Sequence, residues 1–121
     1  MAKLLIVDDE IDVREFAANF FRRRKIDALT ASSCEEAMEI LEKEKPLLVL
    51  LDIKMPGIDG IETLRRIKER DQNVKVIMVT SRKPEEEETF DKCRQLGALY
   101  YIHKPLELDE LEKIVLRELS L

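Results

Sequence analysis

The stretch from residue 4 to residue 10 reads LLIVDDE, so that four apolar residues are followed at once by three acids. A short, uninterrupted apolar run of this kind is typical of a strand that is buried on both faces of a parallel sheet. The acids would then stand at the carboxyl end of that strand. This stretch therefore predicts both an element of the core and a cluster of carboxylates beside it.

Four further short apolar runs predict strands at residues 28–31, 47–51, 74–79 and 99–102. The segments between the strands have helical features. Ser33 and Glu36 form a capping box, Asp59 can cap a helix, and Pro84 suits a first helical turn, while Gly97 suits the position just past a helix end. Five strands that alternate with five helices predict an α/β fold with a parallel sheet and helices on both of its faces.

The first helical segment covers residues 11–24. Its spacing places five apolar side chains on one expected inner face, namely Val13, Phe16, Ala17, Phe20 and Phe21. The segment ends in the basic run of residues 22–25, which complements the negative end of a helix dipole. We interpret this run as a solvated helix end.

The composition suits one cytoplasmic domain that spans residues 1–121. Net charge is −5, which argues against a nucleic-acid-binding surface, and no apolar stretch is long enough for a membrane span. Cys34 and Cys93 lie far apart and match no metal-binding spacing, so we expect two reduced cysteines. Charged residues make up 39% of the chain and are mostly Lys, Arg and Glu. That bias predicts ion-pair networks of the kind found in heat-stable proteins.

Polar side chains stand at the predicted ends of four strands. Asp8 and Asp9 follow the first, Asp52 the third, Thr80 the fourth and Lys104 the fifth. Each of these residues on its own could simply cap a helix or start a turn. Their joint occurrence points to a site, because ligands of open parallel sheets bind beyond the carboxyl ends of the strands.

The chemistry of this set is that of phosphoryl transfer. Three carboxylates in one pocket repel each other unless a cation intervenes, and Mg²⁺ prefers such oxygen ligands. A carboxylate beside the cation, such as that of Asp52, can act as a nucleophile toward phosphorus. The Lys104 ammonium and the Thr80 hydroxyl would neutralise charge on the phosphoryl oxygens.

Four stretches carry a resemblance to a known family. They read LIVDDE at residues 5–10, LLDIKMPG at 50–57, VTS at 79–81 and YIHKP at 101–105. In this order they resemble the receiver domain of bacterial two-component response regulators, over essentially the whole chain. The resemblance implies a flavodoxin-like, doubly wound, three-layer fold with five parallel strands in the order 2-1-3-4-5.

The resemblance also implies roles for individual residues. Asp52 would accept the phosphoryl group, and Thr80 and Lys104 would bind it. Mg²⁺ would be held by Asp9 directly, by Asp8 largely through water, by Asp52 and by the backbone carbonyl of Lys54. Tyr101 would be the aromatic switch residue, and the peptide bond between Lys104 and Pro105 would be cis.

The family implies partners as well. The phosphodonor would be a sensor histidine kinase or a histidine phosphotransfer protein, and the output would go to an effector domain or protein through the fourth helix, fifth strand and fifth helix. Neither nucleic acid nor membrane would bind this domain, which would be a monomer or a phosphorylation-dependent dimer.

Two alternatives remain open from the residues. An Mg²⁺-dependent phosphatase of the haloacid dehalogenase type also forms an aspartyl phosphate, but its DxDx[TV] pattern does not match the sequence after the first strand. A pseudo-receiver that is never phosphorylated would serve only as a binding domain. The complete set of Asp8, Asp9, Asp52, Thr80 and Lys104 argues against it.

Overall fold

Among the residues that the structure describes, a single parallel sheet of five strands in the order β2-β1-β3-β4-β5 organises the fold. The computed structural model describes residues 3–80 and 87–119. In chain order the elements are β1 (Lys3–Val7), α1 (Ile11–Arg22), β2 (Asp27–Ala31), α2 (Cys34–Glu44), β3 (Leu48–Asp52), α3 (Gly60–Arg70), β4 (Lys75–Thr80), α4 (Glu87–Gln95), β5 (Tyr100–His103) and α5 (Leu108–Glu118). The predicted fold class and strand order are therefore confirmed.

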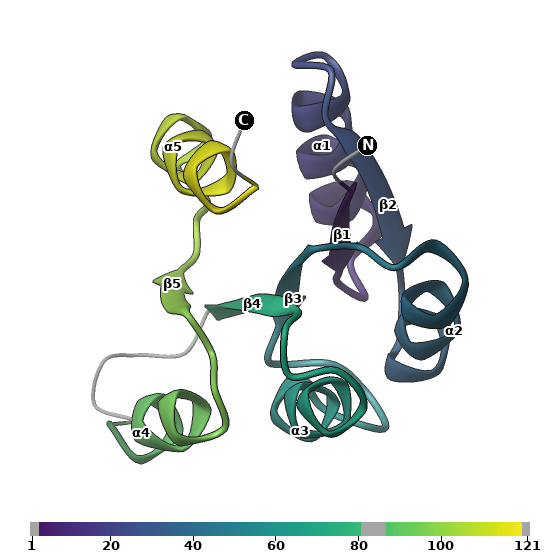
Figure 1. Cartoon of the computed structure of the whole chain (residues 1–121). Helices are drawn as coiled ribbons and strands as arrows, with labels where there is room; N and C mark the ends of the chain where they lie inside the picture. Colours follow the sequence, from purple (N-terminus) through teal and green to yellow (C-terminus); the bar gives the residue numbers. More distant parts are fainter. Residues whose placement is uncertain (1–2, 81–86, 120–121) are drawn as a thin grey trace.

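Helices cover both faces of the sheet and make a three-layer structure (Figure 1). On one face α1 and α5 pack on alternate residues of the strands, for example Leu4, Ile6 and Leu50. On the other face α2, α3 and α4 pack on the intervening residues, for example Leu5 and Leu51. Both faces of the central strands are thus buried, which explains why the interior positions of these strands are all apolar rather than apolar at every second position.

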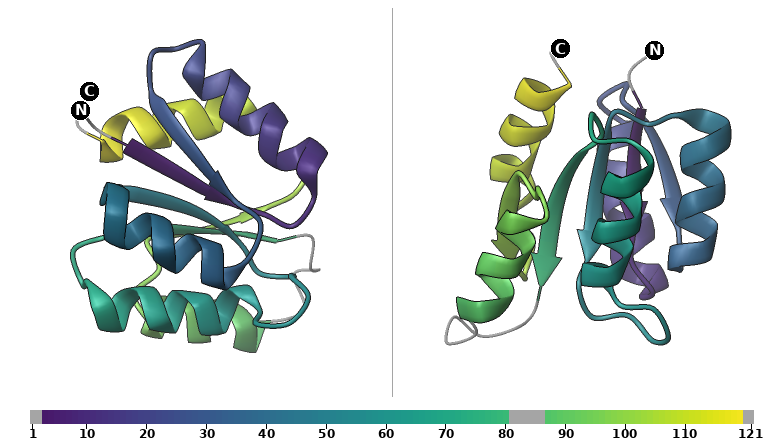
Figure 2. Two further views of the ribbon diagram at one scale, coloured as in Figure 1. Left: turned by 90° about the vertical axis from the view of Figure 1, so that its right-hand side faces the viewer. Right: turned by 60° about the horizontal axis from the view of Figure 1, so that its bottom comes forward.

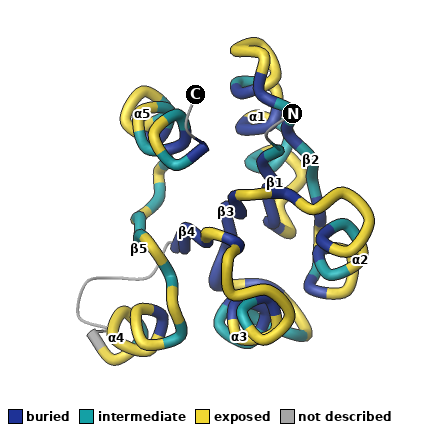
Figure 3. Tube along the Cα trace, viewed as in Figure 1, coloured by how far each residue is buried: buried dark blue, intermediate teal, exposed yellow. Residues whose placement is uncertain are grey.

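The views in Figure 2 show the strands running side by side between the two helical layers. The burial pattern in Figure 3 is darkest along β1, β3 and β4, while the outer sides of the helices are exposed. Because the strands are parallel, their carboxyl ends meet at one edge of the sheet. The polar residues that follow them are therefore gathered together.

The predicted helix ends are largely confirmed. The hydroxyl of Ser33 accepts the Glu36 amide at 3.2 Å, and the carboxylate of Asp59 accepts the Glu62 amide at 3.0 Å. Gly97 follows α4 with a positive φ of 102°. The predicted role of Pro84 lies outside the described residues.

Two details of the sequence interpretation were wrong. Phe16 was expected on the inner face of α1, but 68% of its surface is exposed, since Ala17, Ala18 and Phe21 occupy that face. In addition, β3, β4 and β5 each begin and end one residue later than the apolar runs predicted. The hydrogen-bonded ladder extends to polar residues, as where Asp52 pairs with Val79 and Thr80 with His103.

Two remaining expectations concern the cysteines and the membrane. Cys34 and Cys93 are both buried and are not joined by a disulfide. Within residues 3–80 and 87–119, none of the helices has the length and apolar character needed to cross a membrane.

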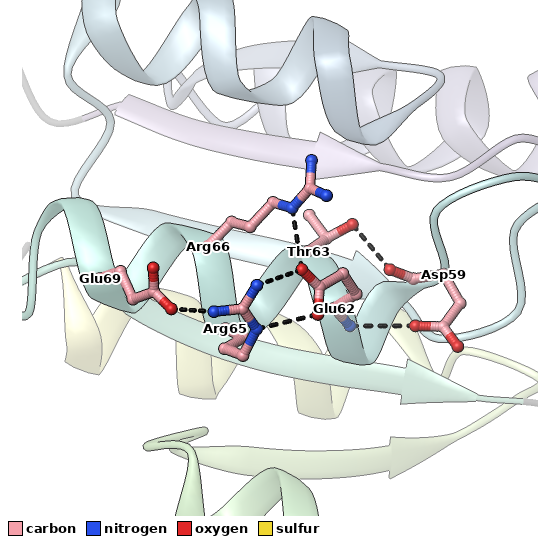
Figure 4. Close-up of polar contacts among 6 residues, drawn as sticks. All are labelled: Asp59, Glu62, Thr63, Arg65, Arg66 and Glu69. Carbon is pink, nitrogen blue, oxygen red and sulfur yellow. Dashed lines mark hydrogen bonds and ion pairs between the residues drawn. The ribbon is translucent and has the colours of Figure 1, made fainter.

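The outer surface of α3 carries a network of ion pairs, shown in Figure 4. Arg65 lies between Glu62 and Glu69, and Arg66 donates through Nε to Glu62 Oε2 at 2.9 Å. The two guanidinium groups hold the pKa of Glu62 down to about 2. A network of this kind contributes more at high temperature than isolated surface pairs do.

This network and the charged composition predict high thermal stability. We expect a melting midpoint above the range of roughly 45–65 °C that is usual for mesophile domains. Replacement Glu62→Gln should lower the midpoint in dilute buffer, and the difference should shrink in 1 M NaCl, where exposed charges are screened. A midpoint within the mesophile range, measured by calorimetry, would contradict this interpretation of the composition.

Candidate phosphoryl-acceptor and metal site

Asp52 is the last residue of β3 and stands at the centre of the carboxyl edge of the sheet. Its surface is only 3% exposed. Burial is the main reason that its pKa rises to about 6, and the nearby Asp8 carboxylate raises it further. The Lys104 ammonium and a hydrogen bond from the Lys54 amide oppose the rise. Asp52 is thus a buried acid whose charge is poorly compensated.

Two further acids face Asp52 from the loop after β1. Carboxylate oxygens of Asp8, Asp9 and Asp52 all lie within 4.8 Å of one another. Asp8 is 4% exposed, and its Oδ1 accepts the Glu10 amide at 2.9 Å, whereas Asp9 is exposed. The three acids predicted from the sequence are therefore brought together.

Lys104 follows β5 and lies among these acids. Its Nζ is 3.1 Å from Asp8 Oδ2, 3.7 Å from Asp52 Oδ2 and 3.6 Å from Glu10 Oε1. Burial alone would lower the pKa of Lys104, but the hydrogen bond to Asp8 and the surrounding negative charges outweigh it and raise the pKa. The Lys104 ammonium is therefore charged and aimed at the acids. The bond between Lys104 and Pro105 is cis, as expected.

The remaining predicted residues lie around this cluster. Thr80 ends β4, is fully buried, and accepts the Lys104 amide on its backbone carbonyl at 2.7 Å. Lys54 is exposed, but its amide contacts the Asp52 carboxylate. Tyr101 lies in β5 with its ring 5.2 Å from that of Phe90 and 5.6 Å from that of His103, between ring centroids. Ser81, the last residue of the VTS stretch, lies outside the described residues.

Sequence reasoning missed the role of Arg14. Its guanidinium donates to the backbone carbonyl of Asp8 at 2.8 Å, so α1 holds the turn that carries two of the three acids. Arg14 lies one helical turn after Glu10, on the side of α1 that faces the site. That spacing was visible in the sequence, but one arginine in a helix with several charged residues carries no signal by itself.

The acids fit a divalent cation. Mg²⁺ prefers carboxylate and carbonyl oxygens as ligands, and carboxylate oxygens of Asp8, Asp9 and Asp52 all lie within 4.8 Å of one another. Burial first, and the neighbouring Asp8 carboxylate second, raise the pKa of Asp52 and so disfavour its charged form, which a bound cation would stabilise. The donor set contains neither sulfur nor imidazole, which suits a hard cation better than zinc or copper.

Comparison with known proteins places this arrangement in a family. Residues 4–116 match the family model described as the response regulator receiver domain. The chain therefore belongs to that family, whose members are phosphorylation-controlled switches of two-component systems and act as signalling domains rather than as catalytic enzymes.

Particular relatives agree with this assignment. The chain is 39% identical to sporulation initiation phosphotransferase F of Bacillus subtilis, over 98% of this chain and 94% of that protein. It is 35% identical to the regulatory protein AtoC of Escherichia coli, of which it spans only 25%. Among solved structures, a CheY-like receiver domain of Methanospirillum hungatei superposes with a TM-score of 0.89 at 28% identity, covering 99% of this chain and 94% of that one. The receiver domain of NtrX from Brucella abortus gives 0.87 at 30% identity, covering 97% and 98%.

The charge on Asp52 should destabilise the metal-free protein. Its pKa is about 6 in the folded state and near 4 when unfolded, so folding favours the protonated form. The free energy of unfolding should therefore fall as the pH rises from about 4 to 6 and stay low above that. Asp52→Asn should be more stable than the wild type by about 1–3 kcal/mol at pH 7.5, and the gap should narrow at pH 4.5. Urea unfolding in the presence of a chelator measures the free energy of unfolding of both proteins at each pH. If the two free energies changed with pH in parallel, the raised pKa of Asp52 would be contradicted.

Proposed function

We propose that Asp52 accepts a phosphoryl group from a phosphohistidine on a partner protein, in a reaction that depends on Mg²⁺. The observation that carries this proposal is the convergence of two buried acids, Asp8 and Asp52, with the exposed acid Asp9 and the Lys104 ammonium at the ends of parallel strands. The chemistry of these groups supports phosphoryl transfer more than any other reaction. The likeness to a phosphotransferase of Bacillus subtilis supports it further.

Asp52 is the nucleophile in this account. At pH 7 a carboxyl group with a pKa of about 6 is mostly ionised, so one of its oxygens can attack phosphorus. The new bond joins Asp52 Oδ to phosphorus while the bond between phosphorus and the donor's imidazole nitrogen breaks, and the electron pair stays on that nitrogen. The Lys104 ammonium and the Thr80 hydroxyl bind the phosphoryl oxygens.

We propose that Asp8, Asp9, Asp52 and the backbone carbonyl of Lys54 hold the cation. When bound, Mg²⁺ would supply positive charge against the phosphoryl oxygens and the crowded carboxylates. Asp8 is already engaged by Lys104 and the Glu10 amide, whereas Asp9 is exposed and carries no such bond among the described contacts. This difference supports direct binding by Asp9 and water-mediated binding by Asp8.

The surface beside the site suits a docking partner. A hollow of about 730 Å³ adjoins Lys104, and its lining is mostly apolar. It is lined by Glu10, Asp12, Val13, Phe16, Lys104, Pro105 and Leu106. Phe16, one of the lining residues, is 68% exposed, and Ile11 in the same helix is 62% exposed. Exposed apolar side chains at the entrance of a reactive site favour contact with the protein that delivers the phosphoryl group.

The output would pass through Thr80 and Tyr101. Movement of the Thr80 side chain toward a new phosphoryl anion would leave space that the Tyr101 ring can fill. Because Tyr101 packs on Phe90, its movement would reach α4 as well as β5. We infer that the α4, β5 and α5 surface then controls an effector domain or protein.

The remaining parts of the proposal concern the whole chain. We propose a single receiver domain over residues 1–121, acting in the cytoplasm without contact to nucleic acid or membrane, as a monomer or as a dimer that forms on phosphorylation. The remaining alternative is a pseudo-receiver, which is never phosphorylated and serves only as a binding domain. The three acids clustered at Asp52 argue against it, because a purely structural site does not need clustered acids.

Asp52 should be the single phosphorylation site. Incubation with acetyl phosphate and Mg²⁺ should add the mass of one phosphoryl group, and Asp52→Asn should add none. Intact-protein mass spectrometry measures both results. Continued labelling of the Asn variant would overturn the choice of nucleophile, and an unlabelled wild type would favour the pseudo-receiver.

Metal binding should depend more on Asp9 than on Asp8. Direct coordination contributes more than a contact through water, so Asp9→Asn should weaken Mg²⁺ binding by about tenfold or more, and Asp8→Asn by less. Titration calorimetry with MgCl₂ gives both dissociation constants. The opposite order would show that the two roles are exchanged.

Phe16 should affect the rate of phosphorylation only when the phosphoryl donor is a protein. Phe16→Ala should slow transfer from a phosphorylated histidine kinase or phosphotransfer protein by about tenfold while leaving phosphorylation by acetyl phosphate unchanged. The matched control is Leu47→Ala, because Leu47 is 53% exposed but stands just before β3, at the opposite end of the strand from Asp52. Equal rates for the two variants with the protein donor would exclude docking at this hollow.

A further inference from the structure

Gly60, the first residue of α3, lies directly against the backbone of the residue that we propose as phosphoacceptor. A Cβ atom at Gly60 would stand 2.1 Å from the carbonyl oxygen of Asp52 and 2.6 Å from Cα of Ile53. Both neighbours are backbone atoms, so neither can rotate out of the way. Any side chain here must displace either α3 or the end of β3.

Hydrogen bonds hold the two backbones in this contact. The Gly60 amide donates to the carbonyl of Ile53 at 2.7 Å, and the Ile53 amide donates to the carbonyl of Val79 at 3.0 Å. The backbone just after Asp52 is therefore fixed by β4 on one side and by the start of α3 on the other. The capping carboxylate of Asp59 in turn fixes the first turn of α3.

The fixed backbone leads straight into the site. Two residues after Asp52, the Lys54 amide hydrogen-bonds the Asp52 carboxylate. The path of residues 52–54 thus sets the direction of the carboxylate, of its amide donor and of the Lys54 carbonyl. We propose that Gly60 is a positioning residue for phosphoryl transfer, which acts by letting α3 approach the Asp52 backbone. This inference rests on the proposed role of Asp52.

A matched pair of variants distinguishes a positioning role of Gly60 from a role in stability alone. Gly57 has a φ of +74°, so alanine there is strained, but its Cβ would meet no atom within 4 Å. Gly57→Ala should lower the melting midpoint without moving Asp52. Gly60→Ala should lower the midpoint and also shift the Asp52 backbone.

The deciding measurement is the rate of phosphorylation by acetyl phosphate at saturating Mg²⁺. We expect a loss of about tenfold or more for Gly60→Ala and less than about twofold for Gly57→Ala, because small misplacements of a reacting group reduce rates steeply. A folded Gly60→Ala protein with the rate of Gly57→Ala would overturn the inference. An unphosphorylated wild type would instead overturn the proposed function.

A second measurement uses the wild-type protein, so it tests the inference even if Gly60→Ala does not fold. Coupling between two sites is reciprocal, so a ligand at Asp52 must stabilise the contact at Gly60 if that contact stabilises the site. Beryllofluoride with Mg²⁺ should slow hydrogen exchange of the Gly60 amide by about threefold more than that of the Asp71 amide, which bonds Ile67 at the other end of α3. Equal slowing of the two amides would contradict the inference.

Discussion

The burial of a carboxylate beside other carboxylates is the constraint on which the rest of this molecule depends. Asp52 is almost fully enclosed at the end of the central strand, and its pKa is raised because water is excluded and Asp8 lies close by. An unpaired buried charge costs several kcal/mol in general, so a fold keeps one only where other groups compensate it. Here the Lys104 ammonium does so in part, from the residue that follows β5. The compensation is incomplete, which favours the binding of a cation there.

The parallel sheet makes this arrangement possible. Its central strands are buried on both faces and carry only apolar side chains between their first and last residues, so the acids, Thr80 and Lys104 are concentrated along one edge. The neighbouring helices then fix the backbone of individual residues along this edge. Arg14 of α1 holds the carbonyl of Asp8, and Gly60 of α3 lies on the carbonyl of Asp52. The site is therefore held by the helices of both layers.

The fold could be predicted from the sequence because its signals are local, namely uninterrupted apolar runs for the strands and residues such as Ser33 and Asp59 for the helix caps. The set of acids could be predicted because strand ends meet in any parallel sheet. Contacts between distant segments could not. The exposed position of Phe16 depends on how α1 is rotated on the sheet, and the approach of Gly60 depends on the angle at which α3 enters. Neither quantity is encoded in hydrophobic spacing.

The central claim is that occupation of the site at Asp52 changes a distant surface. Comparison of amide spectra with and without beryllofluoride, in the presence of Mg²⁺, tests it most directly, with Asp52→Asn as the control. The account predicts shifts near Asp52 and also along α4, β5 and α5, including Phe90 and Tyr101, whose rings are in contact. Shifts confined to residues 8–10 and 52–54 would show that the site binds its ligand without acting as a switch, and would contradict the account.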